Sequence, residues 1–289
     1  MSLPNFMCIG AAKSGTTSLY DILKQHSDVF VPSFKEPHFF DISAVYENGV
    51  SWYEKTYFSG VNKEKSIGDF TPTYLFDKYA PERIHNSLGN DMKFIIILRN
   101  PVDRAYSHYL HSKRDLHEFL SFEDAIKKNV NKVSNYLDYL RLSYIDQSKY
   151  ADMLQRYFAL FSKDNFLILH FEEDFVAERE LTMAKVFSFL NLKEENINFD
   201  INSNKSSKAR FIWIKRLMKK NGWWRQIIKN IIPSLKIRQI IKNKIHRLNV
   251  TKFTPNKLSK KERERMFSYY FSKDIKIVEG MLSRKMNWK

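Results

Sequence analysis

The chain has 289 residues, of which 43% are hydrophobic and 15% aromatic, and its formal net charge is +16. This composition supplies a sizeable core and excludes a disordered chain, while the single cysteine, Cys8, excludes an internal disulfide and favours a reducing compartment. The sequence contains no uncharged apolar run of about 18 residues and no signal-peptide pattern, so we expect a cytoplasmic protein without a membrane span.

The first predicted element is an apolar strand over residues 5–9, which leads into the loop GAAKSGTTS and a helix over 16–26. Gly10 and Gly15 allow the backbone to turn tightly, so the amide groups from Lys13 onward can converge on an anion. The helix start adds a partial positive charge at the same place. The sequence therefore predicts an anion-binding loop between the first strand and the first helix.

This loop is close to a nucleotide-binding P-loop but differs from it. A P-loop places its lysine directly after the second glycine, whereas here Thr16 follows Gly15 and the lysine is Lys13. The strand over 93–98 ends in Arg99, where a metal-dependent triphosphate site would need a carboxylate. We therefore expect no metal, and we expect a ligand with two anionic centres, one at the loop and one at Arg99.

The remaining elements alternate along the chain. Further strands are predicted over 28–31, 66–69 and 165–170, and further helices over 79–88, 101–115, 121–130, 146–162 and 178–190. This alternation is typical of an α/β fold, a P-loop-like parallel β-sheet flanked by helices, which binds ligands at the carboxyl ends of its strands. We expect one domain over 1–289, with an α/β core over 1–200, a basic helical lobe over 201–261 and a C-terminal helix over 262–289.

The basic lobe holds eighteen lysines and arginines and no acidic residue, whereas the rest of the chain sums to −2. Its apolar residues recur at helical spacing, which predicts two or three amphipathic helices and no strand after residue 191. Three interpretations remain open: a solvated face of core-packed helices, a surface for a polyanionic acceptor, or peripheral contact with the anionic inner membrane face.

Five segments carry a resemblance to a known family: IGAAKSGTTSLYDIL, KEPHFFD, SWYEKTYF, GDFTPTYL and LRNPVDRAYSHY. Over about residues 5–200 the sequence resembles sulfotransferases that use 3'-phosphoadenosine 5'-phosphosulfate, especially the heparan-sulfate and bacterial polysaccharide type. One departure is that Asp69-Phe70 stands where the animal enzymes have a Glu-Lys pair. A lysine contact near the acceptor is therefore not carried over to this chain.

The resemblance implies roles for individual residues. Glu36 would be the general base, and Lys13 would stabilise the leaving phosphate. His38 and Tyr144 are candidate acceptor contacts, with a structural role in the core as the alternative for each. The donor's 5'-phosphosulfate would be bound by Lys13, Ser14, Gly15, Thr16, Thr17 and Ser18, and its 3'-phosphate by Arg99, Ser107, Lys205 and Arg210.

The function expected from these features is transfer of a sulfuryl group from the donor to a hydroxyl or amino group of a saccharide, glycolipid or other anionic acceptor. Two alternatives stay open. The loop also allows a P-loop kinase-like phosphotransferase, for which a requirement for Mg²⁺ would be diagnostic. The basic lobe also allows a nucleic-acid-binding protein, but it lacks a recognisable reading motif, so we expect no nucleic acid partner.

Overall fold

The computed structural model describes residues 2–128, 135–201, 207–209, 250–252 and 258–288. Its centre is a five-stranded sheet in the order β2-β3-β1-β4-β5, in which every pairing is parallel. The strands are β1 (Phe6–Gly10), β2 (Val29–Phe30), β3 (Ser66–Asp69), β4 (Lys93–Leu98) and β5 (Phe166–His170). This arrangement confirms the predicted parallel α/β fold, because all five strands lie where the sequence places them.

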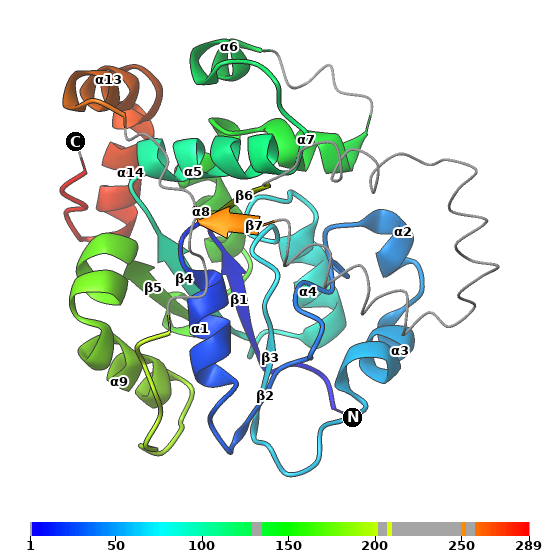
Figure 1. Ribbon diagram of the computed structural model, residues 1–289. Coiled ribbons are helices and arrows are strands. Elements are labelled where there is room, and N and C mark those ends of the chain that lie inside the picture. The colour runs from blue at the N-terminus through cyan, green and yellow to red at the C-terminus, as the bar shows by residue number, and fades with distance from the viewer. Residues whose placement is uncertain (1, 129–134, 202–206, 210–249, 253–257, 289) are drawn as a thin grey trace.

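Helices surround the sheet (Figure 1). The α-helices are α1 (Thr16–Leu23), α2 (Ser43–Tyr46), α3 (Val50–Tyr53), α4 (Ala80–Leu88), α5 (Pro101–Arg114), α6 (Phe122–Lys127), α7 (Tyr136–Leu142), α8 (Ala151–Phe158), α9 (Arg179–Phe189), α13 (Lys260–Met266) and α14 (Ser272–Leu282). Short 3₁₀ turns span Asp146–Ser148 and Lys163–Asn165, and π-helical turns span Glu54–Phe58, Phe171–Ala177 and Phe267–Phe271. Among the described residues, no helix is long and apolar enough to cross a membrane.

The apolar residues of the central strands alternate between two cores, one on each face of the sheet. Met7 and Ile9 of β1 join the cluster covered by α4, α8 and α14, whereas Phe6 and Cys8 join the cluster covered by α1 and α9. Both faces are therefore dry, which is why these strands read as continuous apolar runs in the sequence.

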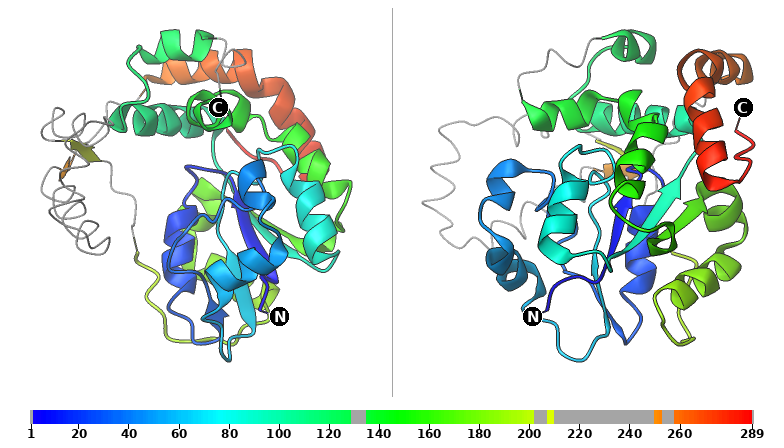
Figure 2. Two further views of the ribbon diagram at one scale, coloured as in Figure 1. Left: turned by 90° about the vertical axis from the view of Figure 1, so that its right-hand side faces the viewer. Right: turned by 180° about the vertical axis from the view of Figure 1, so that it is seen from behind.

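The upper layer of the molecule places α5 across the carboxyl ends of the strands, with α6 and α13 above it (Figures 1 and 2). Helix α5 begins directly after β4 because Asn100 caps it, with Oδ1 accepting the amide of Val102 at 3.0 Å, and Pro101 occupies the first helical position. Because β4 pairs in parallel with β1, the end of β4 and the start of α5 lie beside the anion loop that follows β1.

Two predictions about secondary structure need correction. The helix expected over 146–162 is a 3₁₀ turn followed by α8, which begins at Ala151. Two short antiparallel strands, β6 (Ser207–Ala209) and β7 (Val250–Lys252), occur where no strand was expected. Three-residue strands that pair across some forty residues leave no periodic signal in the sequence. The helical C-terminal region is confirmed by α13 and α14, whereas residues 210–249 of the basic lobe lie outside the described residues.

Candidate functional site

The anion loop runs from Gly10 to the start of α1. Gly15 has a φ of 91°, and a Cβ on it would approach Phe171 Cε2 to 2.9 Å, so the position requires glycine. Helix α1 follows at Thr16 and leaves its first amide groups without helical partners. The Ser14 hydroxyl is fully buried and has no hydrogen-bond partner among the described residues. These features match an anion site with unused donors.

Two arginines, one directly after β4 and one on α5, hold the backbone of this loop. Arg99 Nη1 donates to the carbonyl of Lys13 at 2.9 Å, and Arg104 Nη1 donates to the carbonyl of Ala12 at 3.2 Å. The amide of Ser14 is used within the loop, where it donates to the carbonyl of Ala11 at 3.2 Å, so an anion would be met by the amides that follow at the start of α1. Arg104 is fully buried and also binds Ser148 Oγ and the carbonyl of Tyr144. Burial lowers the pKa of Arg104 to about 10, so the residue stays charged at neutral pH.

The surroundings of Lys13 disfavour the charged form of its side chain. Burial, followed by the charge of Arg114 at the end of α5, lowers the pKa of Lys13 to about 8. Its own φ of 73° is one that residues with a Cβ adopt rarely. An anion bound in the loop would stabilise the charged ammonium and raise the pKa of Lys13 again.

Lys35 joins Glu36 to the start of α1, which directly follows the anion loop. The Lys35 ammonium lies 2.7 Å from Glu36 Oε1 and 3.3 Å from Thr17 Oγ1 in the first turn of α1. The Glu36 carboxylate is 38% exposed, so an acceptor from solvent can reach it. Its φ of 66° is again left-handed, and such local strain is concentrated at functional sites. The structure therefore brings the predicted base to the predicted anion loop.

His38 lies between two carboxylates. Its Nδ1 is 2.9 Å from Asp41 Oδ2, and its Nε2 is 3.8 Å from Glu36 Oε2. Burial alone would lower the pKa of His38, but the hydrogen bond and the charge of Asp41 outweigh it and raise the pKa. Thr73 Oγ1 donates to Asp41 at 2.5 Å and fixes this partner. The His38 side chain remains 28% exposed, so contact with an acceptor stays a prediction.

Asp69, the acidic residue at the end of β3, lies under the segment that carries Glu36 and His38. Its buried carboxylate accepts hydrogen bonds from Tyr53 at 2.5 Å and Tyr74 at 3.1 Å. The Tyr74 hydroxyl in turn accepts the backbone amide of Phe39 at 3.0 Å. Burial raises the pKa of Asp69 to about 6 despite these hydrogen bonds. Asp69 therefore supports the segment that carries Glu36 and His38 from below.

The other predicted site residues have different outcomes. Ser107 is half-buried on α5, two turns after Pro101, and its contact with a 3'-phosphate stays a prediction. Lys205 and Arg210 lie outside the described residues.

Tyr144, left between acceptor cleft and core, is a core residue: it is 1% exposed, its ring packs edge-on against His108 and its hydroxyl donates to Glu118. This burial favours the core role that the sequence left open, and contact of Tyr144 with an acceptor stays a prediction.

Sequence reasoning missed Lys35 and Arg104 as parts of the site. Both lie inside the segments that carry the family resemblance, KEPHFFD and LRNPVDRAYSHY. The resemblance could therefore have pointed to both residues, but nothing in the sequence indicated which groups near the anion loop they contact.

The parallel sheet, the anion loop after its first strand and the arginine directly after the neighbouring strand agree with the expected resemblance to sulfotransferases. The chain belongs to the sulfotransferase domain family, whose model matches residues 3–230. A crystal structure of a sulfotransferase from Alicyclobacillus acidocaldarius matches 99% of this chain and 98% of that one, with a TM-score of 0.68 and 25% identity.

Curated relatives are similar over part of the chain. Human heparan sulfate glucosamine 3-O-sulfotransferase 6 is 31% identical over 195 residues, which are 66% of this chain and 53% of that protein. The membrane-associated sulfotransferase kil1 of Dictyostelium discoideum is 38% identical over 111 residues, which are 38% of this chain and 23% of that protein. The chain spans about half the length of the heparan sulfate relatives it matches.

Proposed function

We propose that this protein transfers a sulfuryl group from 3'-phosphoadenosine 5'-phosphosulfate to a hydroxyl or amino group of a saccharide-type acceptor. The observation that carries the proposal is the Lys35 ammonium, which contacts both Glu36 and Thr17 and so joins an exposed carboxylate to an anion loop. Such a pair of groups, a base beside an anion cradle, is what transfer of an anionic group to a hydroxyl requires.

The donor fits the groups left unsatisfied in the structure. The buried Ser14 hydroxyl is without a hydrogen-bond partner among the described residues, and Lys13 is a cation that burial destabilises. A 5'-phosphosulfate at the loop and a 3'-phosphate at Arg99 would satisfy the two ends of the site with one nucleotide. Membership in the sulfotransferase domain family supports this donor over a nucleoside triphosphate.

In the proposed step, the acceptor oxygen attacks sulfur while Glu36 accepts its proton. The bond between sulfur and the 5'-phosphate oxygen breaks, and adenosine 3',5'-bisphosphate leaves with the electron pair. Lys13 and the loop amides stabilise the charge that grows on this oxygen. His38, which lies between Glu36 and Asp41, orients the base.

For the acceptor we propose an anionic saccharide. Two observations support this acceptor. The similar curated proteins are named as heparan sulfate glucosamine 3-O-sulfotransferases. Residues 201–261 of this chain hold eighteen cations, which would attract an anionic saccharide. We further propose that the reaction takes place in the cytoplasm, where a glycolipid acceptor would bring the protein to the inner membrane face.

The function is tested with donor labelled in its sulfuryl group and a panel of N-sulfated and unsulfated oligosaccharides and glycolipids. We expect label in a saccharide product, and we expect Glu36→Gln to bind the donor normally but to lower transfer by about 10²–10⁴-fold. Glu82→Gln, on the exposed face of α4, is the matched control and should transfer normally.

Binding is measured in parallel by thermal shift in the presence of EDTA. Adenosine 3',5'-bisphosphate should raise the melting temperature with increasing concentration. A shift with ATP and Mg²⁺ but none with the bisphosphate would contradict the donor and favour a phosphotransferase. Full activity of Glu36→Gln would remove Glu36 from the mechanism.

A further inference from the structure

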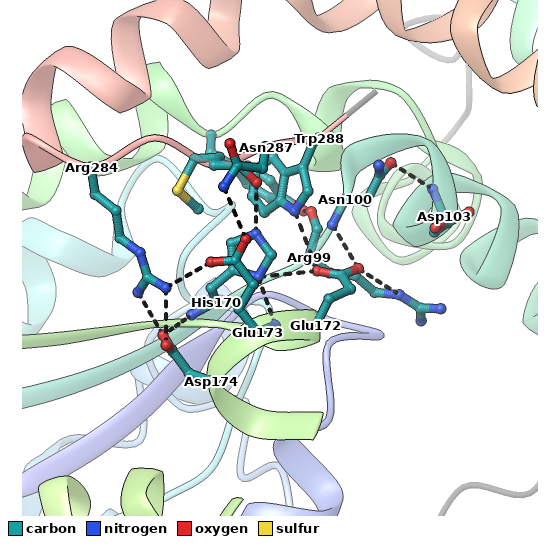
Figure 3. A network of polar contacts seen from close by, with 12 residues as sticks. Arg99, Asn100, Asp103, His170, Glu172, Glu173, Asp174, Arg284, Asn287 and Trp288 are labelled. Atoms are coloured by element: carbon teal, nitrogen blue, oxygen red, sulfur yellow. Dashed lines mark hydrogen bonds and ion pairs between the residues drawn. The ribbon is translucent and has the colours of Figure 1, made fainter. Parts of the chain in front are cut away.

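Residues 284–288 cross the carboxyl end of β5 and are fixed there by two charged contacts (Figure 3). Arg284 donates to both oxygens of Asp174, at 2.6 and 2.9 Å, and to Glu173 at 3.1 Å. The amide of Asn287 donates to the other oxygen of Glu173 at 3.1 Å. Bidentate charged pairs of this kind fix direction as well as position.

Trp288 lies at the inner end of this segment. It is 7% exposed, and its ring packs on that of His170 with centroids 5.0 Å apart. His170 Nε2 lies 2.8 Å from the carbonyl of Met286, while its Nδ1 accepts the amide of Glu173, which fits the tautomer with the proton on Nε2. The indole Nε1 of Trp288 donates to Glu172 Oε2 at 3.3 Å.

The other oxygen of Glu172 faces the donor site. Oε1 accepts the backbone amide of Asn100 at 3.1 Å and lies 4.0 Å from Arg99 Nε. Arg99 is further confined by the ring of Phe171, 4.9 Å from its guanidinium carbon, and by the carbonyl of Lys13. Figure 3 shows the Glu172 carboxylate between the Trp288 indole and the Arg99 guanidinium. One carboxylate thus connects the C-terminal segment to the arginine of the second anion centre.

We propose that Glu172, held by Trp288, is a positioning residue for Arg99 and thereby sets the preference for a nucleotide with a 3'-phosphate over one without it. This inference rests on the proposed function, in which Arg99 binds the 3'-phosphate. Two effects of the carboxylate oppose each other: it orients the guanidinium, and its charge repels the phosphate. Orientation dominates, because Glu172 is near the Nε side of Arg99, and a guanidinium fixed in advance loses less freedom when it binds.

The experiment compares the dissociation constants of adenosine 5'-phosphate and adenosine 3',5'-bisphosphate, and their ratio measures the 3'-preference. Glu172→Gln removes the charge and keeps the size, and we expect the ratio to fall about three- to tenfold. Trp288→Phe keeps an aromatic ring and changes no charge but removes the N–H that donates to Glu172, and it should lower the ratio in the same direction by a smaller factor. Glu173→Gln is the matched control: it loosens the same segment without touching Asn100 or Arg99, and the ratio should stay at the wild-type value.

A variant that acts through Arg99 has no effect once Arg99 is gone. In the background of Arg99→Ala, Glu172→Gln should therefore leave the ratio unchanged. Melting temperatures without nucleotide show whether each variant is folded, and a folding defect alone would weaken both nucleotides equally.

A rise of the ratio in Glu172→Gln would mean that the carboxylate acts by repulsion, and it would overturn the inference. An unchanged ratio in both Glu172→Gln and Trp288→Phe would do the same. If the wild-type protein binds both nucleotides equally, the donor assignment itself fails. A wild-type preference that Arg99→Ala removes and Glu172→Gln keeps would refute the positioning role alone.

Discussion

In the proposed function, the charge of Lys13 depends on whether the site holds an anion. Burial and the neighbouring Arg114 bring its pKa to about 8, whereas a bound anion would raise the pKa again. Below pH 8 the ammonium is already charged when the nucleotide binds. Above pH 8 binding must first take up a proton, so we expect the affinity for adenosine 3',5'-bisphosphate to fall by up to about tenfold per pH unit. Calorimetric titration at pH 7, 8 and 9 measures this slope.

The control for this prediction is Lys13→Arg, because a guanidinium stays protonated throughout this range. Whatever its absolute affinity, the variant should bind with little dependence on pH between 7 and 9. Equal slopes for the variant and the wild-type protein would show that another group is responsible for the titration.

At the scale of the elements, the end of β3 supports the segment that carries Glu36. Burial raises the pKa of Asp69 to about 6, above the ordinary 3.8. The folded state therefore favours the protonated carboxyl group more strongly than the unfolded chain does. The contribution of this group to stability is therefore complete below pH 4 and is lost as the pH rises from 4 to 6. A shift of two units corresponds to about 3 kcal/mol.

The comparison with Asp69→Asn, which cannot ionise, isolates this contribution. We expect the free energy of unfolding of the wild-type protein, relative to the variant, to rise by roughly 2 kcal/mol between pH 7.5 and pH 4.5, because part of the full contribution appears only below pH 4.5. Urea denaturation at both pH values gives the two differences. A pH-independent difference would contradict the burial of a titrating carboxylate at this position.

Helix α5 connects the anion loop to the rest of the fold through Arg104. Arg104→Lys keeps the charge but cannot reach Ala12, Tyr144 and Ser148 together, so buried carbonyls lose donors. We expect a loss of stability of roughly 2–4 kcal/mol and, in the folded protein, an affinity for the bisphosphate that is lower by about tenfold or more.

The matched control is Arg156→Lys on α8. Arg156 pairs with Asp152 and donates to the carbonyl of Phe76 at 2.9 Å, without contacting the anion loop. This variant should lose stability and keep its affinity for the nucleotide. Parallel losses of affinity in the two variants would mean that Arg104 has no specific role in shaping the loop.

At the scale of the whole molecule, the charge is concentrated in residues 201–261. Attraction of an anionic acceptor by these cations is screened over about 8 Å at physiological salt and should weaken as salt rises. Reversing the charge of Lys219, Lys220 and Lys229 should therefore raise the Michaelis constant for an anionic saccharide, with donor affinity unchanged. Sedimentation with anionic vesicles tests the membrane instead of the saccharide. A triple variant equal to the wild type in both assays at low salt would leave the segment as a solvated face.

The sequence by itself determined the parts of the site that are contiguous in the chain. The strand, loop and helix around Lys13 follow from apolar spacing and two glycines, and Arg99, Asn100 and Pro101 place an arginine, a cap and a helix start in one run. Parallel strands have their carboxyl ends at the same edge, so the meeting of these two segments could also be predicted. Local propensity and pattern were sufficient there because each feature depends on residues a few positions apart.

Only the tertiary structure decided which distant side chains support these segments. Arg104 and Ala12 are separated by 92 residues, and Trp288 and Glu172 by 116. The burial of Tyr144 and the raised pKa of Asp69 likewise depend on packing from several elements. Side-chain direction and desolvation arise from the packed surroundings, and periodicity along one segment carries no information about them.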